Sequence, residues 1–121
     1  MMVQPFLPAI QTEGELSFIF IDGEFSHALK KSAAKGDYRI QSSYGGTEAA
    51  IVPSKSDLEQ AIRVLSSVDD ELLYARVDML RADDGELYLM ELEAIEPYLY
   101  PLEGPVLGPR LAAAVARRLC L

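Results

Sequence analysis

The stretch YARVDMLRADDGELYLMELE, residues 74–93, governs how the rest of the chain is interpreted. Two runs in which apolar and polar residues alternate flank Asp83-Asp84-Gly85. An Asp-Gly pair between two such runs is among the strongest short-range signals for a β-hairpin. The sequence therefore predicts two antiparallel strands joined by a two-residue turn at Asp84 and Gly85.

This turn fixes which residues face each other across the hairpin. Counting outward from it, Asp83 pairs with Glu86, Asp78 with Glu91 and Arg76 with Glu93. Because side chains alternate between the two faces of a strand, Arg76 and three carboxylates share one face. The other face is expected to carry Val77, Met79, Met90 and Leu92.

Like charges that face each other directly are destabilising, so Asp78 opposite Glu91 requires a compensating cation. Arg76 supplies part of that charge. A hard divalent ion such as Mg²⁺, which prefers carboxylate oxygens, would supply more. The alternative is that the charged face is only a solvated surface, or an edge kept polar against aggregation. A turn that slips by one residue would also break this register.

The order Arg-x-Asp, a glycine turn and Glu-x-Glu resembles the metal-binding end of the ATP-grasp superfamily. The strings that carry the resemblance are QPFLP (4–8), GELSFIFIDGEFSHALKK (14–31), GDYRIQSSYGG (36–46), YARVDM (74–79) and LMELEAIEP (89–97). Together they resemble the glutathione-synthetase-like branch, and they correspond to its C-terminal lobe only. The resemblance implies a ligase that uses ATP and Mg²⁺ to activate a carboxylate as an acyl phosphate, which an amine or similar nucleophile then attacks.

The resemblance also implies roles for individual residues. The expected metal ligands are Asp78, Glu91 and Glu93, where Glu93 replaces the asparagine that is commoner in the superfamily. The expected catalytic residues, which would orient the acyl phosphate and phosphate oxygens, are Arg39 and Arg76. The expected nucleotide contacts are Gln4, Phe6, Glu15 and Lys31.

A basic segment precedes the hairpin in the sequence. Four of the eleven basic residues are Lys30, Lys31, Lys35 and Arg39, and Gly45-Gly46 follows them. Arginine suits bidentate contacts with phosphate, and glycines let backbone N–H groups approach an anion closely. On spacing alone, a mobile surface loop explains this segment equally well.

Several other residues could have either a structural or a functional role. His27, the single histidine, lies in the alternating run Phe25, His27, Leu29 and is expected to be packed and hydrogen-bonded rather than catalytic. Tyr98 and Tyr100 either line a substrate pocket or pin the Pro-rich loop at 94–109. Glu96, which precedes a proline, is either a further site residue or part of a turn.

The remaining patterns predict an α+β fold in which an antiparallel β-sheet built from hairpins is covered by about two helices. Residues 16–21 are predicted to form a central strand. A turn at Asp22-Gly23 is predicted to connect it to a second strand at 24–31. Residues 3–7 read as a short strand. Residues 53–68 are predicted to form one helix, and residues 110–121 a second helix. In the first helix Ser56 and Glu59 are expected to form a capping box, with an apolar stripe at Leu58, Ala61, Ile62 and Leu65.

The composition limits the classes of function. The chain has 121 residues, a net charge of −8 and one cysteine. Its length suits a single domain over residues 1–121, and its charge disfavours nucleic acid and anionic membranes as partners. No apolar run approaches the roughly 20 residues that cross a bilayer. One cysteine and one histidine cannot build a His/Cys zinc cluster, and a reducing cytoplasm is the expected compartment.

ATP-grasp enzymes hold ATP between two lobes, and the strings above correspond to one of them. We therefore expect the C-terminal half of an ATP-grasp module, weakly active or inactive by itself. A complementing N-terminal lobe or a homodimer would complete the site for a small carboxylate and an amine-type substrate. The alternative from another class is a non-catalytic α+β module that self-associates through the apolar surface a second lobe would cover.

Overall fold

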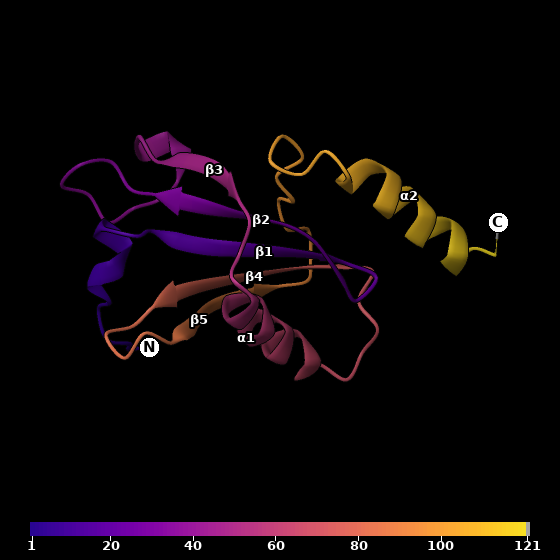
Figure 1. Cartoon of the computed structure of the whole chain (residues 1–121), viewed down its shortest axis with the longest axis horizontal. Helices are drawn as coiled ribbons and strands as arrows, with labels where there is room; N and C mark the ends of the chain where they lie inside the picture. The colour runs from indigo at the N-terminus through magenta and orange to yellow at the C-terminus, as the bar shows by residue number, and fades with distance from the viewer. Residues whose placement is uncertain (121) are drawn as a thin grey trace.

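The computed structural model describes residues 1–120, which form one five-stranded antiparallel sheet with two α-helices (Figure 1). The strand order is β3-β2-β1-β4-β5. The strands are β1 Glu15–Ile21, β2 Glu24–Ser32, β3 Thr47–Ile51, β4 Tyr74–Arg81 and β5 Leu87–Glu93. The helices are α1 Lys55–Ser66 and α2 Leu107–Arg118, with short 3-10 helices η1 Pro8–Gln11 and η2 Ser42–Tyr44. The expected α+β fold is confirmed.

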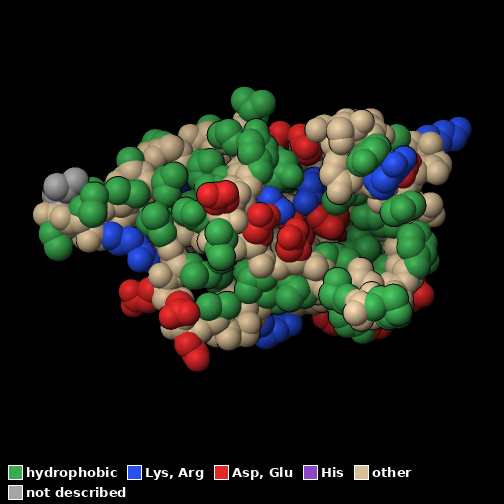
Figure 2. Space-filling view, turned by 180° about the vertical axis from the view of Figure 1, so that it is seen from behind, with side chains coloured by type: hydrophobic (Ala, Val, Ile, Leu, Met, Phe, Trp, Pro, Cys, Tyr) green, Lys and Arg blue, Asp and Glu red, His purple; other side chains and the backbone are tan. Residues whose placement is uncertain are grey.

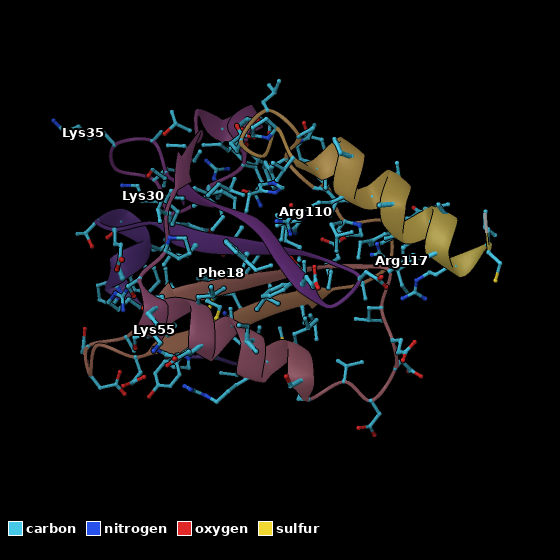
Figure 3. All side chains as sticks on the ribbon, turned by 45° about the vertical axis from the view of Figure 1, so that its right-hand side comes forward. Phe18, Lys30, Lys35, Lys55, Arg110 and Arg117 are labelled. Carbon is cyan, nitrogen blue, oxygen red and sulfur yellow. The ribbon has the colours of Figure 1, made fainter. Side chains whose placement is uncertain are left out.

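The central strand β1 is buried on both faces and separates two hydrophobic clusters. Phe18 lies at the centre of the cluster between the sheet and α1, together with Ala61 of the helix (Figure 3). Ile19 points to the other face and packs with Leu107 and Ala114 of α2. The helix α2 extends beyond the end of the sheet, so it covers only part of that face (Figure 1). Within residues 1–120 there is no helix with the length and apolar character of a bilayer span.

The N-cap of helix α1 lies two residues earlier than the sequence suggested. Ser54 is the N-cap, and its hydroxyl accepts a hydrogen bond of 3.1 Å from the Asp57 backbone N–H. The predicted capping box of Ser56 and Glu59 is wrong, because the polar run offers two serines with an acid three residues later.

The buried face of α1 also differs in one position. Ala61 is fully buried, and Leu58 and Leu65 pack against the same cluster as predicted. Ile62 is 41% exposed, and Val64 takes its place against the core. The apolar stripe is therefore rotated slightly around the helix axis from the predicted one.

The ends of the chain depart further from the sequence prediction. Residues 3–7 form no strand, because they do not pair with the sheet, and the first regular element is η1. The last helix begins at Leu107 rather than Arg110, and its predicted final residue, Leu121, lies outside the described residues. The edge strand β3 was not predicted, since its residues are mostly exposed and show no alternation of apolar and polar side chains.

The β1–β2 turn is the predicted Asp22-Gly23 turn, but the strand after it contains a β-bulge. Both turn residues have positive φ, 54° and 79°. Phe20 pairs with Phe25, whereas Ile19 pairs with His27, so Ser26 is the extra residue. Phe25 consequently packs with the α1-side cluster, and His27 points to the opposite face. The prediction that Phe25, His27 and Leu29 share one face is wrong for this reason.

The β4–β5 hairpin differs from the predicted hairpin at two places, and the two differences have opposite effects on the strand register. Its loop has three residues, 83–85, instead of the predicted two: the Ala82 N–H donates to the Glu86 carbonyl at 2.9 Å, and Gly85 has φ 85°. This loop shifts the register by one, so Asp83 does not pair with Glu86 and Met79 faces Leu89.

A bulge at Met90 then restores the predicted register toward the end of the hairpin. Asp78 faces Glu91 and Arg76 faces Glu93, as the sequence predicted. The predicted position of Met90 opposite Met79 is wrong, because Met90 is the unpaired bulge residue. Without this bulge, Glu91 and Glu93 would point toward α1 and away from Asp78.

Arg81, at the end of β4, joins three separate parts of the fold. Its guanidinium contacts Glu13 at 2.8 Å and Asp57 of α1 at 2.8 Å, and it donates to the Gly85 carbonyl at 2.9 Å. The two carboxylates raise the pKa of Arg81 through hydrogen bonds. This residue ties α1 and the hairpin loop to the segment before β1.

We predict that Arg81→Met lowers the free energy of unfolding by about 1–2 kcal/mol, a value reduced for partial solvent screening of these ion pairs. Urea unfolding of the purified chain measures it. Lys55→Met is the control: its ammonium is mostly exposed and lies 3.9 Å from Glu59, so we expect a change within about 0.5 kcal/mol. Equal losses in the two variants would contradict a special role for Arg81.

Candidate active site

A charged pocket of about 210 Å³ lies on the face of the sheet opposite α1. Figure 2 shows acidic and basic side chains gathered on this face, with hydrophobic side chains around them. The lining residues are Glu15, Lys31, Ile40, Gln41, Glu48, Arg76, Asp78, Glu91 and Tyr100. They come from all five strands, from the segment before η2 and from the loop after β5.

Asp78 is the buried centre of this pocket, with only 1% of its surface exposed. Each of the three central strands supplies a partner for its carboxylate. Ser17 of β1 donates at 2.5 Å, Arg76 of β4 donates through Nε at 3.0 Å, and Lys31 of β2 lies at 3.3 Å. Within residues 1–120, every buried side-chain nitrogen or oxygen has a hydrogen-bond partner.

Lys31 stands between two carboxylates, since its Nζ also lies 2.5 Å from Glu15. Burial opposes the charge on Lys31, but Asp78 and Glu15 together raise its pKa above the usual value. The pKa of Glu15 is raised by burial and by the nearby Asp78, although Lys31 acts in the opposite direction. The buried lysine is therefore held in its charged form by two anionic neighbours.

Arg76 gathers the three carboxylates that the sequence predicted as metal ligands. Its guanidinium lies 3.0 Å from Asp78, 3.4 Å from Glu91 and 2.7 Å from Glu93. It also donates to the Tyr98 carbonyl at 3.2 Å. Burial opposes the positive charge, yet Asp78 and Glu93 raise the pKa of Arg76. The cation that compensates the facing carboxylates in this structure is thus Arg76.

The donor atoms suit a hard divalent ion, because all three carboxylates offer oxygen and share one face. No group of three or more His, Cys, Asp or Glu side chains within residues 1–120 is arranged to hold a metal ion as it stands. All three carboxylates are instead in contact with the guanidinium of Arg76. The Glu91 side chain is 57% exposed, and its contact with Arg76 is the longest of the three.

Three of the predicted site residues lie elsewhere. Arg39 is exposed, bonded to Asp37 at 2.7 Å and stacked on Tyr44 at 3.9 Å, and it does not line the pocket. Gln4 and Phe6 are exposed in the segment before η1. The nearby Lys35 extends into solvent (Figure 3), so the sequence-predicted basic segment is split between β2 and an exposed loop.

The structure also adds residues that sequence reasoning did not assign to the site. Ser17 is the only polar side chain in an otherwise apolar part of β1, and that exception was its signal. Glu48 was missed because β3 was not expected, and Gln41 lies in the segment before η2, to which no pocket residue was assigned. Tyr100, for which the sequence left two roles open, lines the pocket, whereas Tyr98 is 59% exposed.

His27 is packed and hydrogen-bonded, as the sequence predicted. Its Nε2 lies 2.9 Å from the Leu99 carbonyl and 3.1 Å from the Tyr100 carbonyl, and its Nδ1 lies 2.9 Å from the Ser26 hydroxyl. Burial lowers the pKa of His27, although the two carbonyls act in the opposite direction. The imidazole therefore connects β2 to the loop that carries Tyr100.

A larger cavity, of about 540 Å³, lies at the end of the sheet near the C-termini of both helices. Its lining includes Asp69, Asp70 and Arg118, and it shares no residue with the charged pocket. Arg118 is already paired with Asp22 at 3.0 Å. We regard the charged pocket as the candidate active site, because the buried Lys31, Arg76 and Asp78 all line it.

All five strands of the sheet lie within the match to a known protein family. The RimK-like ATP-grasp domain matches residues 1–100, and the chain belongs to this family. Members of the family use ATP.

Several known ligases are similar to the chain. A probable alpha-L-glutamate ligase of Xanthomonas oryzae pv. oryzae is 34% identical over 98% of this chain and 38% of its own length. A glutathione synthetase of Rhodopseudomonas palustris is 29% identical over 94% of this chain and 35% of its own length. The crystal structure of the D-cycloserine synthetase DcsG superposes with a TM-score of 0.77 at 27% identity, covering 96% of this chain and 41% of that one. The chain thus spans about two-fifths of the length of the relatives it matches.

We predict that Lys31→Met destabilises the fold by about 3–5 kcal/mol, because it leaves Glu15 without its cation and leaves the buried Asp78 with Arg76 alone. In the double variant with Glu15→Gln, one of those carboxylates is also removed, so the loss should be smaller than the sum by about 0.5–3 kcal/mol. Denaturant unfolding of both single variants and the double variant measures this coupling.

Lys30→Met is the matched control on the same strand, and we expect it to change stability by no more than about 0.5 kcal/mol. Strict additivity of Lys31→Met and Glu15→Gln would show that the two side chains do not act as a pair.

The lowered pKa of His27 predicts a pH dependence of stability. As the pH falls below 6.5, the unfolded chain binds a proton at this histidine before the folded chain does. Stability is therefore fully present above that pH and declines as the pH falls through the folded value. Thermal melts between about pH 7.5 and pH 5 should show a smaller decline for His27→Gln. The groups facing the imidazole are Ser26, the two loop carbonyls and Glu103, and all remain in that variant.

Proposed function

We propose that this chain forms the phosphate- and metal-binding lobe of an ATP-dependent ligase that joins a carboxylate to an amine-type nucleophile through an acyl phosphate. The observation that carries the proposal is the buried group of Asp78, Lys31 and Arg76, with Glu91 and Glu93 on the same face, in a chain of the RimK-like ATP-grasp family. Related ligases of this family are similar over nearly all of the chain.

The chemistry of phosphoryl transfer needs positive charge placed against the phosphate oxygens. Lys31 and Arg76 are the pocket cations that would meet them, and both keep their charge although they are buried. Asp78, Glu91 and Glu93 would hold Mg²⁺, which offsets negative charge on the phosphates when it is bound. Ser17 and Glu15 keep Asp78 and Lys31 in position through the hydrogen bond and ion pair described above.

Arg39 would contact the acyl phosphate only after leaving Asp37, because its guanidinium is now paired with that carboxylate. The anionic substrate would compete with Asp37 for the same donors. Loops of this kind often close over the substrate, which favours this exchange.

The substrates in this proposal are ATP, a small carboxylate and an amine-type compound. A second lobe would bind the other side of the nucleotide, and Gln4 and Phe6 would contact the adenine at the junction. The cytoplasm, where ATP and reduced cysteine coexist, is the compartment that this function suits.

A second candidate is a self-associating module without catalysis. Exposed apolar side chains favour it, among them Val3 at 81%, Phe6 at 61% and Leu102 at 89%. Such surfaces commonly mark interfaces. Sedimentation of the chain with and without nucleotide distinguishes the two: a dimer indifferent to nucleotide and Mg²⁺ supports the second candidate.

The test of the ligase proposal is a titration of the chain with ADP, with and without Mg²⁺, followed by backbone NMR shifts because they detect weak binding. We expect binding that requires Mg²⁺ and that falls at least about tenfold, or about 1.4 kcal/mol, in Glu91→Gln. Glu59→Gln on α1 is the matched control, since the two glutamate side chains are 55% and 57% exposed. Shifts that do not depend on Mg²⁺, or equal affinities in both variants, would overturn the proposal.

A further inference from the structure

The bulge in β2 places His27 on the face of the candidate active site. If pairing continued unbroken from the turn, His27 would face Phe18 and point into the core under α1. The extra residue Ser26 moves it opposite Ile19, so that it shares a face with Lys31. Bulges are common next to active sites, where they redirect a side chain. The bulge therefore turns His27 away from the main core and toward the loop after β5.

The hydrogen bonds of the imidazole define what it does there. Two carbonyl oxygens, from Leu99 and Tyr100, lie 2.9 and 3.1 Å from Nε2, so this nitrogen must carry the proton and donate it. Nδ1 then accepts from the Ser26 hydroxyl at 2.9 Å. A neutral imidazole satisfies all three contacts, and only 8% of the residue is exposed.

The loop that receives these bonds has a backbone that needs support. Tyr100 and Glu96 have positive φ values, 51° and 57°, which cost energy for residues other than glycine. Gly104 packs directly against the ring: a Cβ at this position would lie 2.2 Å from His27 Nδ1. The imidazole thus fills the space under the loop and bonds its carbonyls at the strained residue.

The side chain at this strained residue is part of the pocket wall. The Tyr100 ring lies 5.9 Å from Lys31 Nζ and 5.9 Å from the Arg76 guanidinium carbon, measured to its centroid. Burial raises the pKa of Tyr100, although both cations act in the opposite direction. Moving the loop would withdraw this ring from both pocket cations and let water reach them.

We propose that His27 is a positioning residue for the candidate site: it donates Nε2–H to the carbonyls of Leu99 and Tyr100 and so holds the Tyr100 ring against Lys31 and Arg76. That this anchoring contributes to ligation rests on the proposed function. The anchoring itself does not depend on that function and is measured without any nucleotide.

Amide hydrogen exchange of three variants tests the anchoring. His27→Leu fills the space but lacks a donor, His27→Gln restores an N–H near the position of Nε2, and Leu102→Ala changes an exposed loop residue as control. We expect exchange in residues 99–104 to rise at least about tenfold in His27→Leu, while the β1 amides keep the protection that reports global unfolding. In His27→Gln and Leu102→Ala, exchange should stay near that of the unmodified chain.

A uniform rise across the sheet and loop in His27→Leu would show a general packing role and overturn the proposal. The same conclusion follows if His27→Gln exchanges as fast as His27→Leu, since the donor would then be irrelevant.

A titration with Mg²⁺ and ADP separates this proposal from the proposed function. If the unmodified chain binds and His27→Leu weakens binding while His27→Gln restores it, both proposals are supported. If the unmodified chain does not bind, the proposed function fails, and the exchange result alone decides the role of His27. If it binds and His27→Leu binds equally well, the Tyr100 wall does not matter to the site and the positioning proposal fails.

Discussion

The buried carboxylate of Asp78 is the constraint on which the arrangement of the sheet depends. A carboxylate with 1% exposure is costly unless hydrogen-bond donors and cations replace the water that it loses. Ser17, Lys31 and Arg76 supply them from three adjacent strands. A slip in the register of any of these strands would separate the charges, so the polar site and the register of the central sheet stabilise each other.

Two bulges determine which side chains reach this site. The extra residue Met90 in β5 brings Glu91 and Glu93 to the face of Asp78, and the extra residue Ser26 in β2 brings His27 to the same face. Each bulge changes the face of every side chain beyond it, because side chains in a strand alternate with a period of two. The apolar half of this face packs under α2, and the polar half forms the pocket.

Each cation of the pocket is already paired with carboxylates of the same chain. Arg76 holds the carboxylates that would bind Mg²⁺, Lys31 is held by two acids, and Arg39 is held by Asp37 in the loop outside. In the proposed function, a ligand that brings both phosphate and a divalent cation would exchange partners with these pairs, so that no buried charge is left without a partner. Such an exchange would let a chain with a net charge of −8 present cations to the anionic substrate of the proposed function.

The sequence by itself determined the class of the fold, the two hairpins and the central strand. These follow from local rules: turn residues with positive φ, alternation along strands and the opposition of residues across a hairpin. The pairing of Asp78 with Glu91 was also predicted correctly, but only because the Met90 bulge compensated for a loop one residue longer than expected.

Only the tertiary structure decided that Arg76 contacts all three carboxylates, that Arg39 lies outside the pocket, and that Ser17 and Tyr100 belong to it. It also decided to which face of the sheet His27 points and that β3 pairs with β2 at the sheet edge. These features depend on contacts between residues distant in sequence and on bulges that no local pattern marks. The partners of a buried charge are the groups that the folded chain places within a few ångströms of it. The spacing of residues along one strand does not specify which groups these are.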